Sequence, residues 1–147
     1  MKILYSPKNN PRVIIIQKLY SYFIDNDSKI EFPKHRFKKF IKDIVKGTIE
    51  RDDIISAELN NKYLINLNEK KFDLLFKTII KAATYEFLFK PDLPFKIIIK
   101  EYLDASNFFI NENQTKFLNA LLDQIRKKKD ERISDYKWIF FRFSKKK

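Results

Sequence analysis

The stretch that decides the fold is FDLLFKTIIKAATYEF, residues 72–87. Its apolar side chains recur at alternating steps of three and four residues, which is the period of one face of an α-helix. These positions are Phe72, Leu75, Phe76, Ile79, Ile80, Ala83 and Phe87. The series predicts a central, largely buried helix. Burial of such a face offsets the entropy of ordering the chain only if several helices pack together.

Helical spacing continues on both sides of this stretch. Pro11 suits the first turn of a first helix, because its missing backbone donor costs nothing there. The other expected helices begin after Pro33, near Asp52 (running to about Leu64), at Pro94, and after a polar turn over residues 111–115. Gly47 lies inside the second helix or ends it. The chain is therefore expected to be all-α, a compact helical bundle.

Several classes of function are excluded by composition. The chain has no cysteine, and His35 is its one histidine, so zinc sites built from thiolates and imidazoles are impossible. A single glycine rules out every Gly-rich phosphate loop. The carboxylates from which a nuclease site could start are Glu50, Asp52, Asp53 and Glu86, and a helix start accounts for the first three. We expect no enzymatic activity, no metal and no cofactor.

The charge points to a polyanionic partner. Thirty-one Lys and Arg against 19 Asp and Glu give +12, which favours RNA through long-range attraction and counterion release. The first ten residues lack the apolar run of a secretory signal, and no stretch approaches the length of a membrane span. We expect a soluble, cytoplasmic protein with no membrane partner.

The charge is unevenly distributed between two expected parts, a domain at residues 1–129 and an extension at 130–147. Residues 126–147 hold ten Lys or Arg against three acids, with aromatic side chains between them. The extension is interpreted as an RNA-binding arm or as a final helix docked on the bundle. Docking through Ile133, Tyr136, Phe140 and Phe143 is favoured, because exposed aromatic side chains are costly in water. Attachment to a membrane surface is a weaker third interpretation.

The order and spacing of several motifs resemble the NusB family of bacterial transcription antitermination factors, over about residues 8–128. In the second half the matching residues are Thr84-Tyr85-Glu86-Phe87, Pro94-Phe95-Lys96, Glu101 and Lys116-Phe117-Leu118-Asn119-Ala120-Leu121-Leu122-Asp123. In the first half they are Arg12, Gln17-Lys18-Leu19-Tyr20 and Val45-Lys46-Gly47.

This resemblance implies an all-α fold of two small helical subdomains without enzymatic activity. It also implies pairing with a NusE-like small-subunit ribosomal protein. The pair is expected to bind boxA-type single-stranded sites in nascent ribosomal RNA and to act on the transcription elongation complex. Two other interpretations remain open: an RNA-binding domain like that of some ribosomal RNA cytosine methyltransferases, and a non-catalytic helical adaptor.

Five residues are expected to contact RNA. Lys8 and Arg12 retain charge where the family has an arginine cluster, and Lys81 replaces a family arginine without its bidentate geometry. Lys116 and Phe117 place a cation beside an aromatic ring, the combination on which unpaired bases stack. For Phe117, a place in the core is an equally good interpretation.

Two further residues are expected to face the NusE-like partner. Tyr20 lies on the apolar stripe of the first helix, where a core tyrosine is the alternative. Phe76 stands where the family commonly has an acidic residue, so an apolar contact would replace a polar one.

Overall fold

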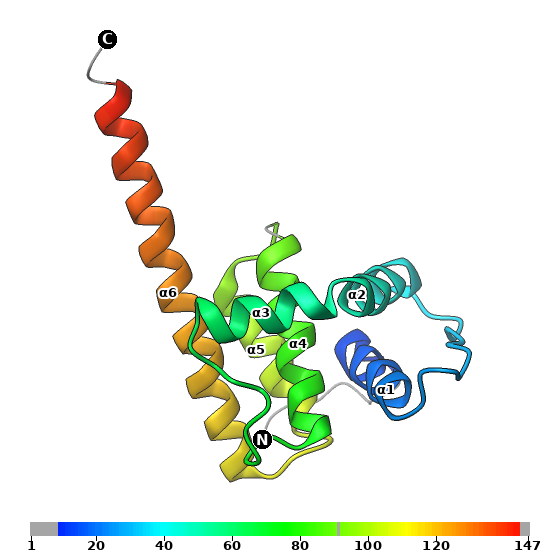
Figure 1. Ribbon diagram of the computed structural model, residues 1–147. Coiled ribbons are helices and arrows are strands. Elements are labelled where there is room, and N and C mark those ends of the chain that lie inside the picture. The colour runs from blue at the N-terminus through cyan, green and yellow to red at the C-terminus, as the bar shows by residue number, and fades with distance from the viewer. Residues whose placement is uncertain (1–8, 91, 145–147) are drawn as a thin grey trace, which may run out of the picture.

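The computed structural model describes the backbone of residues 9–90 and 92–144, and the side chains of residues 9–90 and 92–128. The described residues form α1 (Pro11–Ile24), α2 (Lys38–Glu50), α3 (Asp52–Asn61), α4 (Leu74–Phe89), α5 (Phe95–Ser106) and α6 (Glu112–Ser144), and no strand (Figure 1). The expected all-α class is confirmed. Within these ranges, no helix has both the length and the apolar character that crossing a bilayer requires.

Helix α4 is the centre of the bundle and contacts each of the other five helices. The stripe predicted from residues 72–87 is buried apart from Leu75, which is partly buried, and Ile79, Ile80 and Phe87 are fully inaccessible to solvent. Helices α1, α2 and α3 pack on α4, and α5 and α6 pack on it as well, while α6 contacts only α4 and α5 among the helices. The N-terminal and C-terminal helices therefore meet mainly through α4, although α1 also contacts α5.

Three helix boundaries differ from those expected. Helix α2 begins at Lys38 instead of directly after Pro33. Helix α3 ends at Asn61 instead of Leu64, and Leu64 adopts a φ of 59°, which does not continue a right-handed helix. The polar turn expected over residues 111–115 is the first turn of α6. There the Asn111 backbone N–H donates to Gln114 Oε1 (3.1 Å) and the Gln114 N–H donates to Asn111 Oδ1 (2.8 Å), a reciprocal cap.

The C-terminal extension continues α6 as far as Ser144. Figure 1 shows this part of the helix projecting away from the bundle, so its backbone does not fold back as the separate docked helix that was expected. The side chains expected to dock, Ile133, Tyr136, Phe140 and Phe143, lie outside the described side chains.

Gly47 lies inside α2, where the Tyr85 side chain of α4 packs directly over it. A Cβ atom at this position would overlap the hydroxyl and ring of Tyr85, which is buried and stacks on Phe89 with ring centroids 5.1 Å apart. The glycine is thus required by a close approach between two helices and not by backbone conformation.

We predict that Gly47→Ala lowers the free energy of unfolding by about 1–3 kcal/mol, because the added methyl group overpacks this contact. Helix propensity alone predicts the opposite sign, a gain of about 1 kcal/mol. Urea denaturation monitored by circular dichroism measures the difference, with Lys46→Ala on the exposed face as a matched control. A stabilised Gly47→Ala variant would show that Tyr85 moves aside freely.

Candidate nucleic-acid interface

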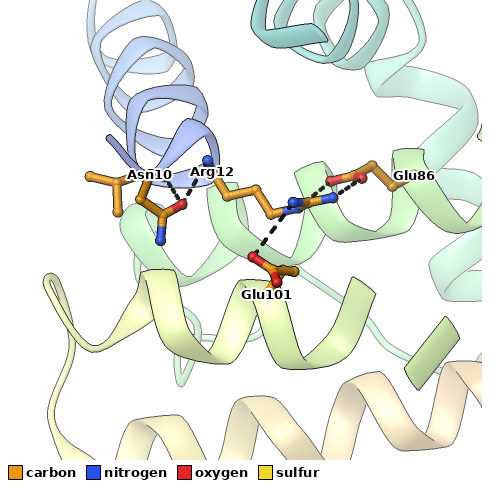
Figure 2. Close-up of polar contacts among 5 residues, drawn as sticks. Asn10, Arg12, Glu86 and Glu101 are labelled. Carbon is orange, nitrogen blue, oxygen red and sulfur yellow. Dashed lines mark hydrogen bonds and ion pairs between the residues drawn. The ribbon is translucent and has the colours of Figure 1, made fainter. Parts of the chain in front are cut away.

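Arg12 is the best-anchored charged side chain in the described structure. Asn10 caps α1 through Oδ1, which accepts from the backbone N–H of Arg12 at 3.0 Å and of Val13 at 3.4 Å. The Arg12 side chain then crosses to α4, where Nε donates to Glu86 Oε2 (3.1 Å) and Nη2 donates to Oε1 (2.7 Å) (Figure 2). A second carboxylate, Glu101 of α5, lies 3.8 Å from Nη1.

The surroundings of this ion pair hold the guanidinium in its charged form. Arg12 is 6% exposed and Glu86 is 0% exposed, and the guanidinium lies over the rings of Phe40 and Tyr102 at 5.1 and 5.5 Å. Burial alone lowers the pKa of Arg12, but electrostatic interaction with Tyr102 and the hydrogen bonds to Glu86 raise it above its ordinary value. Burial, reinforced by the Glu86 carboxylate, also raises the pKa of Tyr102. The geometry favours a structural role for Arg12, joining α1 to α4 and α5, over the expected phosphate contact.

Lys81 also has partners within the chain. Its Nζ lies 2.8 Å from Asp52 Oδ1 and 4.6 Å from the centroid of the Phe23 ring, and its side chain is 13% exposed. These contacts connect α4 to the start of α3 and the end of α1. The expected RNA contact by Lys81 would require the ammonium group to leave both partners, so the structure favours an internal role.

The three aromatic rings of Phe72, Phe76 and Phe117 form a nearly parallel stack, here called the aromatic ledge. The centroids of Phe76 and Phe117 are 5.4 Å apart with an interplanar angle of 18°, and those of Phe72 and Phe117 are 5.9 Å apart at 16°. Phe117 is 37% exposed, whereas Phe72 and Phe76 are buried. Lys71 Nζ lies 5.3 Å from the Phe72 centroid and 5.7 Å from the Phe117 centroid.

The position of Phe117 in the ledge combines the two interpretations that the sequence left open, a core residue and an RNA contact. Its ring stacks on the buried rings of Phe72 and Phe76 and the residue is 37% exposed, so Phe117 lies at the edge of the core and also contributes aromatic surface. Phe76 lies behind it and is 3% exposed, which leaves little surface for the partner contact expected of it. Lys71 was not singled out from the sequence, because only the loop before α4 brings it to these rings.

The remaining expected site residues are more loosely placed. Lys116 is next to Phe117, its side chain is 73% exposed, and its Nζ is 3.8 Å from Glu112 Oε1. Such a pair contributes little to stability and leaves the cation available to a ligand. Tyr20 is partly exposed on α1, in keeping with the partner contact expected of it. Lys8 lies outside the described residues.

A pocket of about 470 Å³ opens near the N-terminal ends of α1, α2 and α5. Its lining residues are Asn9, Asn10, Pro11, Arg12, Arg36, Phe37, Phe40, Leu93, Ile97 and Glu101. Sequence reasoning missed this pocket, since it depends on how three helices converge. Elsewhere in the described part of the chain, no group of three or more His, Asp or Glu side chains is placed to hold a metal ion.

The fold and these side chains define a small, basic, all-helical protein. The chain belongs to the NusB family, whose model matches residues 9–127. The transcription antitermination protein NusB of Rickettsia bellii (strain OSU 85-389) is 30% identical over 125 residues, covering 80% of this chain and 78% of the relative. That of Buchnera aphidicola subsp. Cinara cedri is 25% identical over 125 residues, covering 85% and 83%.

A solved structure of T. maritima NusB is also similar, with a TM-score of 0.63 and 25% identity, covering 84% of this chain and 93% of that one. The resemblance stated from the sequence is therefore confirmed for family and fold. The family match ends at residue 127, so the projecting part of α6 from 130 onward lies beyond it.

Proposed function

We propose that the chain is an RNA-binding transcription antitermination factor. In this proposal it pairs with a NusE-like ribosomal protein, and the pair binds boxA-type single-stranded sites in nascent ribosomal RNA and joins the transcription elongation complex. Membership of the NusB family supports the first part, since similar proteins from Rickettsia and Buchnera are named transcription antitermination proteins.

The observation that carries the proposal is the aromatic ledge. Unpaired bases stack on exposed aromatic rings, while neighbouring cations attract the phosphates that flank each base. The ledge supplies both: Phe117 is 37% exposed, Lys71 Nζ lies 5.7 Å from its ring centroid, and the adjacent residue in the chain, Lys116, has a side chain that is 73% exposed. Stacking on Phe72 and Phe76 holds the Phe117 ring in place, so little entropy is lost when a base docks on it.

The proposed RNA site accordingly consists of Phe117, Lys116 and Lys71, with Lys8 on the approach to α1. Tyr20 is proposed as a partner contact, and Phe76 is proposed to act on either ligand only through the ring of Phe117. Arg12 and Lys81 are instead proposed to stabilise the bundle through their ion pairs with Glu86 and Asp52. The mechanism is assembly: one protein surface and one RNA surface, each of modest affinity, bind far more tightly when both are engaged.

We predict that boxA-like RNA binds at least about tenfold more tightly when the NusE-like protein is present, a difference of about 1.4 kcal/mol. Fluorescence anisotropy titrations with the full chain, with and without the partner, measure this factor. A scrambled RNA of the same length and composition is the control.

Equal affinity for matched and scrambled RNA, unchanged by the partner, would contradict the proposed assembly and leave a helical adaptor as the better interpretation. Repeating the titrations across salt concentrations counts phosphate contacts, because the log–log slope for single strands is about −0.7 per contact.

A further inference from the structure

The pocket at the N-terminal ends of α1, α2 and α5 is separate from the aromatic ledge, and none of its lining residues belongs to the ledge. Two large apolar side chains of its lining are exposed to solvent: Phe37 is 44% exposed and Ile97 is 45% exposed. Its volume of about 470 Å³ lies in the range of small-ligand sites, about 300–1,000 Å³. A site of this size suits a planar group of a few rings, with room for solvent.

On the inner side of the pocket, the positive charge of Arg12 is compensated by nearby carboxylates. The Arg12 guanidinium is neutralised by Glu86 at 2.7 Å, and the Glu101 carboxylate stands 3.8 Å away on the pocket lining. A phosphate placed here would meet one already paired arginine and one carboxylate, so the inner pocket does not attract anions. Glu101 is instead an acceptor for N–H groups of a neutral ligand.

The same lining includes a hydrogen-bond donor. Asn10 uses its Oδ1 atom to cap α1, which leaves its amide nitrogen as the part of the side chain able to donate to a ligand. Figure 2 shows this nitrogen turned away from the cap hydrogen bonds. The lining of the pocket therefore includes one hydrogen-bond donor, Asn10, and one acceptor, Glu101, and the edge of a nucleobase can pair with both kinds of group.

The lining of the pocket also includes an aromatic ring and a cation. The Arg36 guanidinium lies 5.4 Å from the centroid of the Phe37 ring, and both side chains are exposed. The Phe37 backbone N–H donates to His35 Nδ1 at 2.9 Å, which fixes the chain just before α2 begins. An aromatic ring with an adjacent arginine is the arrangement that binds single-stranded nucleic acid through stacking and phosphate attraction.

We propose that this pocket receives one unpaired base of the bound RNA. The base stacks on Phe37, Arg36 attracts a flanking phosphate, and Asn10 and Glu101 hydrogen-bond to its edge. This inference rests on the proposed RNA-binding function and adds to it a second base site, distinct from the ledge.

The test scans abasic sites through the boxA-like RNA and titrates each RNA into the full chain with the NusE-like protein present. Wild type is compared with Phe37→Leu, and Phe108→Leu is the matched control, because Phe108 is a comparably exposed phenylalanine, at 37%, outside the pocket. Thermal denaturation verifies that both variants remain folded.

We expect Phe37→Leu to weaken binding of intact RNA about tenfold and Phe108→Leu to leave it unchanged. One abasic position should weaken wild type by a similar factor and weaken Phe37→Leu no further, since the same contact is already lost. If RNA binds and Phe37→Leu behaves as wild type, the pocket inference is overturned while the proposed function stands. If Phe37→Leu weakens binding of the NusE-like protein without RNA, the pocket holds a peptide and the inference is also overturned. Absence of any RNA binding by wild type overturns the proposed function itself.

Discussion

Glu86→Ala is expected to lower the free energy of unfolding by about 3–5 kcal/mol, the typical cost of removing one partner from a buried ion pair. The substitution leaves the Arg12 guanidinium, 6% exposed, without the carboxylate that accepts two of its hydrogen bonds. Glu101 at 3.8 Å is too distant to replace both bonds. For a domain stable by about 5–15 kcal/mol, this is a large fraction of the total. Urea denaturation followed by circular dichroism measures it.

Two further variants test whether the pair or the individual residues matter. Arg12→Leu combined with Glu86→Leu removes both charges, so the double variant should be more stable than either single variant. Glu50→Ala removes a carboxylate that is 69% exposed and 3.9 Å from Arg51, and it should change stability by less than about 0.5 kcal/mol. Additive single-site losses in the double variant would contradict the buried-pair interpretation.

Variants of Arg12 and Glu86 also distinguish a loss of stability from a loss of RNA contact. A side chain that touches a phosphate changes the salt dependence of binding when removed, by about 0.7 in the log–log slope for single strands. If Arg12 is structural, conservative replacement lowers stability and leaves that slope unchanged among the folded molecules. The family's N-terminal basic residues therefore need not share one role: Arg12 faces the interior, and the proposed RNA contact at this end falls to Lys8.

The buried position of Arg12 is predictable from the spacing of residues in the sequence. Arg12 precedes Ile16 by four residues, and Ile16 precedes Leu19 by three, so all three lie on one face of α1. Glu86 stands three residues after Ala83 on the buried face of α4. One cation and one anion, each on an apolar stripe, predict a buried pair, because an isolated charge there would be prohibitively costly.

Other features depend on tertiary packing and were beyond the sequence. The order of the helices and the burial of α4 follow from periodicity, which a single helix encodes by itself. The pairing of Lys81 with Asp52 requires knowing how α3 lies against α4, and the pocket requires the convergence of three helix ends. The start of α6 was partly predictable. Asn111 and Gln114 have the spacing of a capping box, although the same polar residues also favour a turn.

Net charge is consequently a poor guide to the proposed RNA surface of this chain. Of the expected cationic contacts, Arg12 and Lys81 are engaged with carboxylates inside the protein, and only Lys116 among the described ones reaches into solvent. In the proposed site we therefore expect RNA affinity to depend more on aromatic stacking than on the number of surface cations. This makes Phe117 the residue on which the proposed function depends most directly.

Phe117→Leu is expected to weaken RNA binding by about 1–3 kcal/mol, or roughly fivefold to 150-fold, because leucine has no aromatic face for a base to stack on. Leucine still covers Phe72 and Phe76, so the free energy of unfolding should fall by less than about 1.5 kcal/mol. Anisotropy titration of boxA-like RNA with the NusE-like protein present measures the affinity, and Phe108→Leu, an equally exposed phenylalanine at 37%, is the control.

Comparing Phe117→Leu with Lys116→Ala tests whether the aromatic ledge binds RNA through base stacking or through charge. Removing that cation should lower the salt slope by about 0.7 while costing less affinity than loss of the ring, because an exposed phosphate contact is weak at moderate ionic strength. Phe117→Leu should do the reverse, lowering affinity at every salt concentration by a similar factor and leaving the slope unchanged. Should Phe117→Leu reduce only stability, with RNA affinity intact, the ring belongs to the core alone and the ledge is no platform for bases.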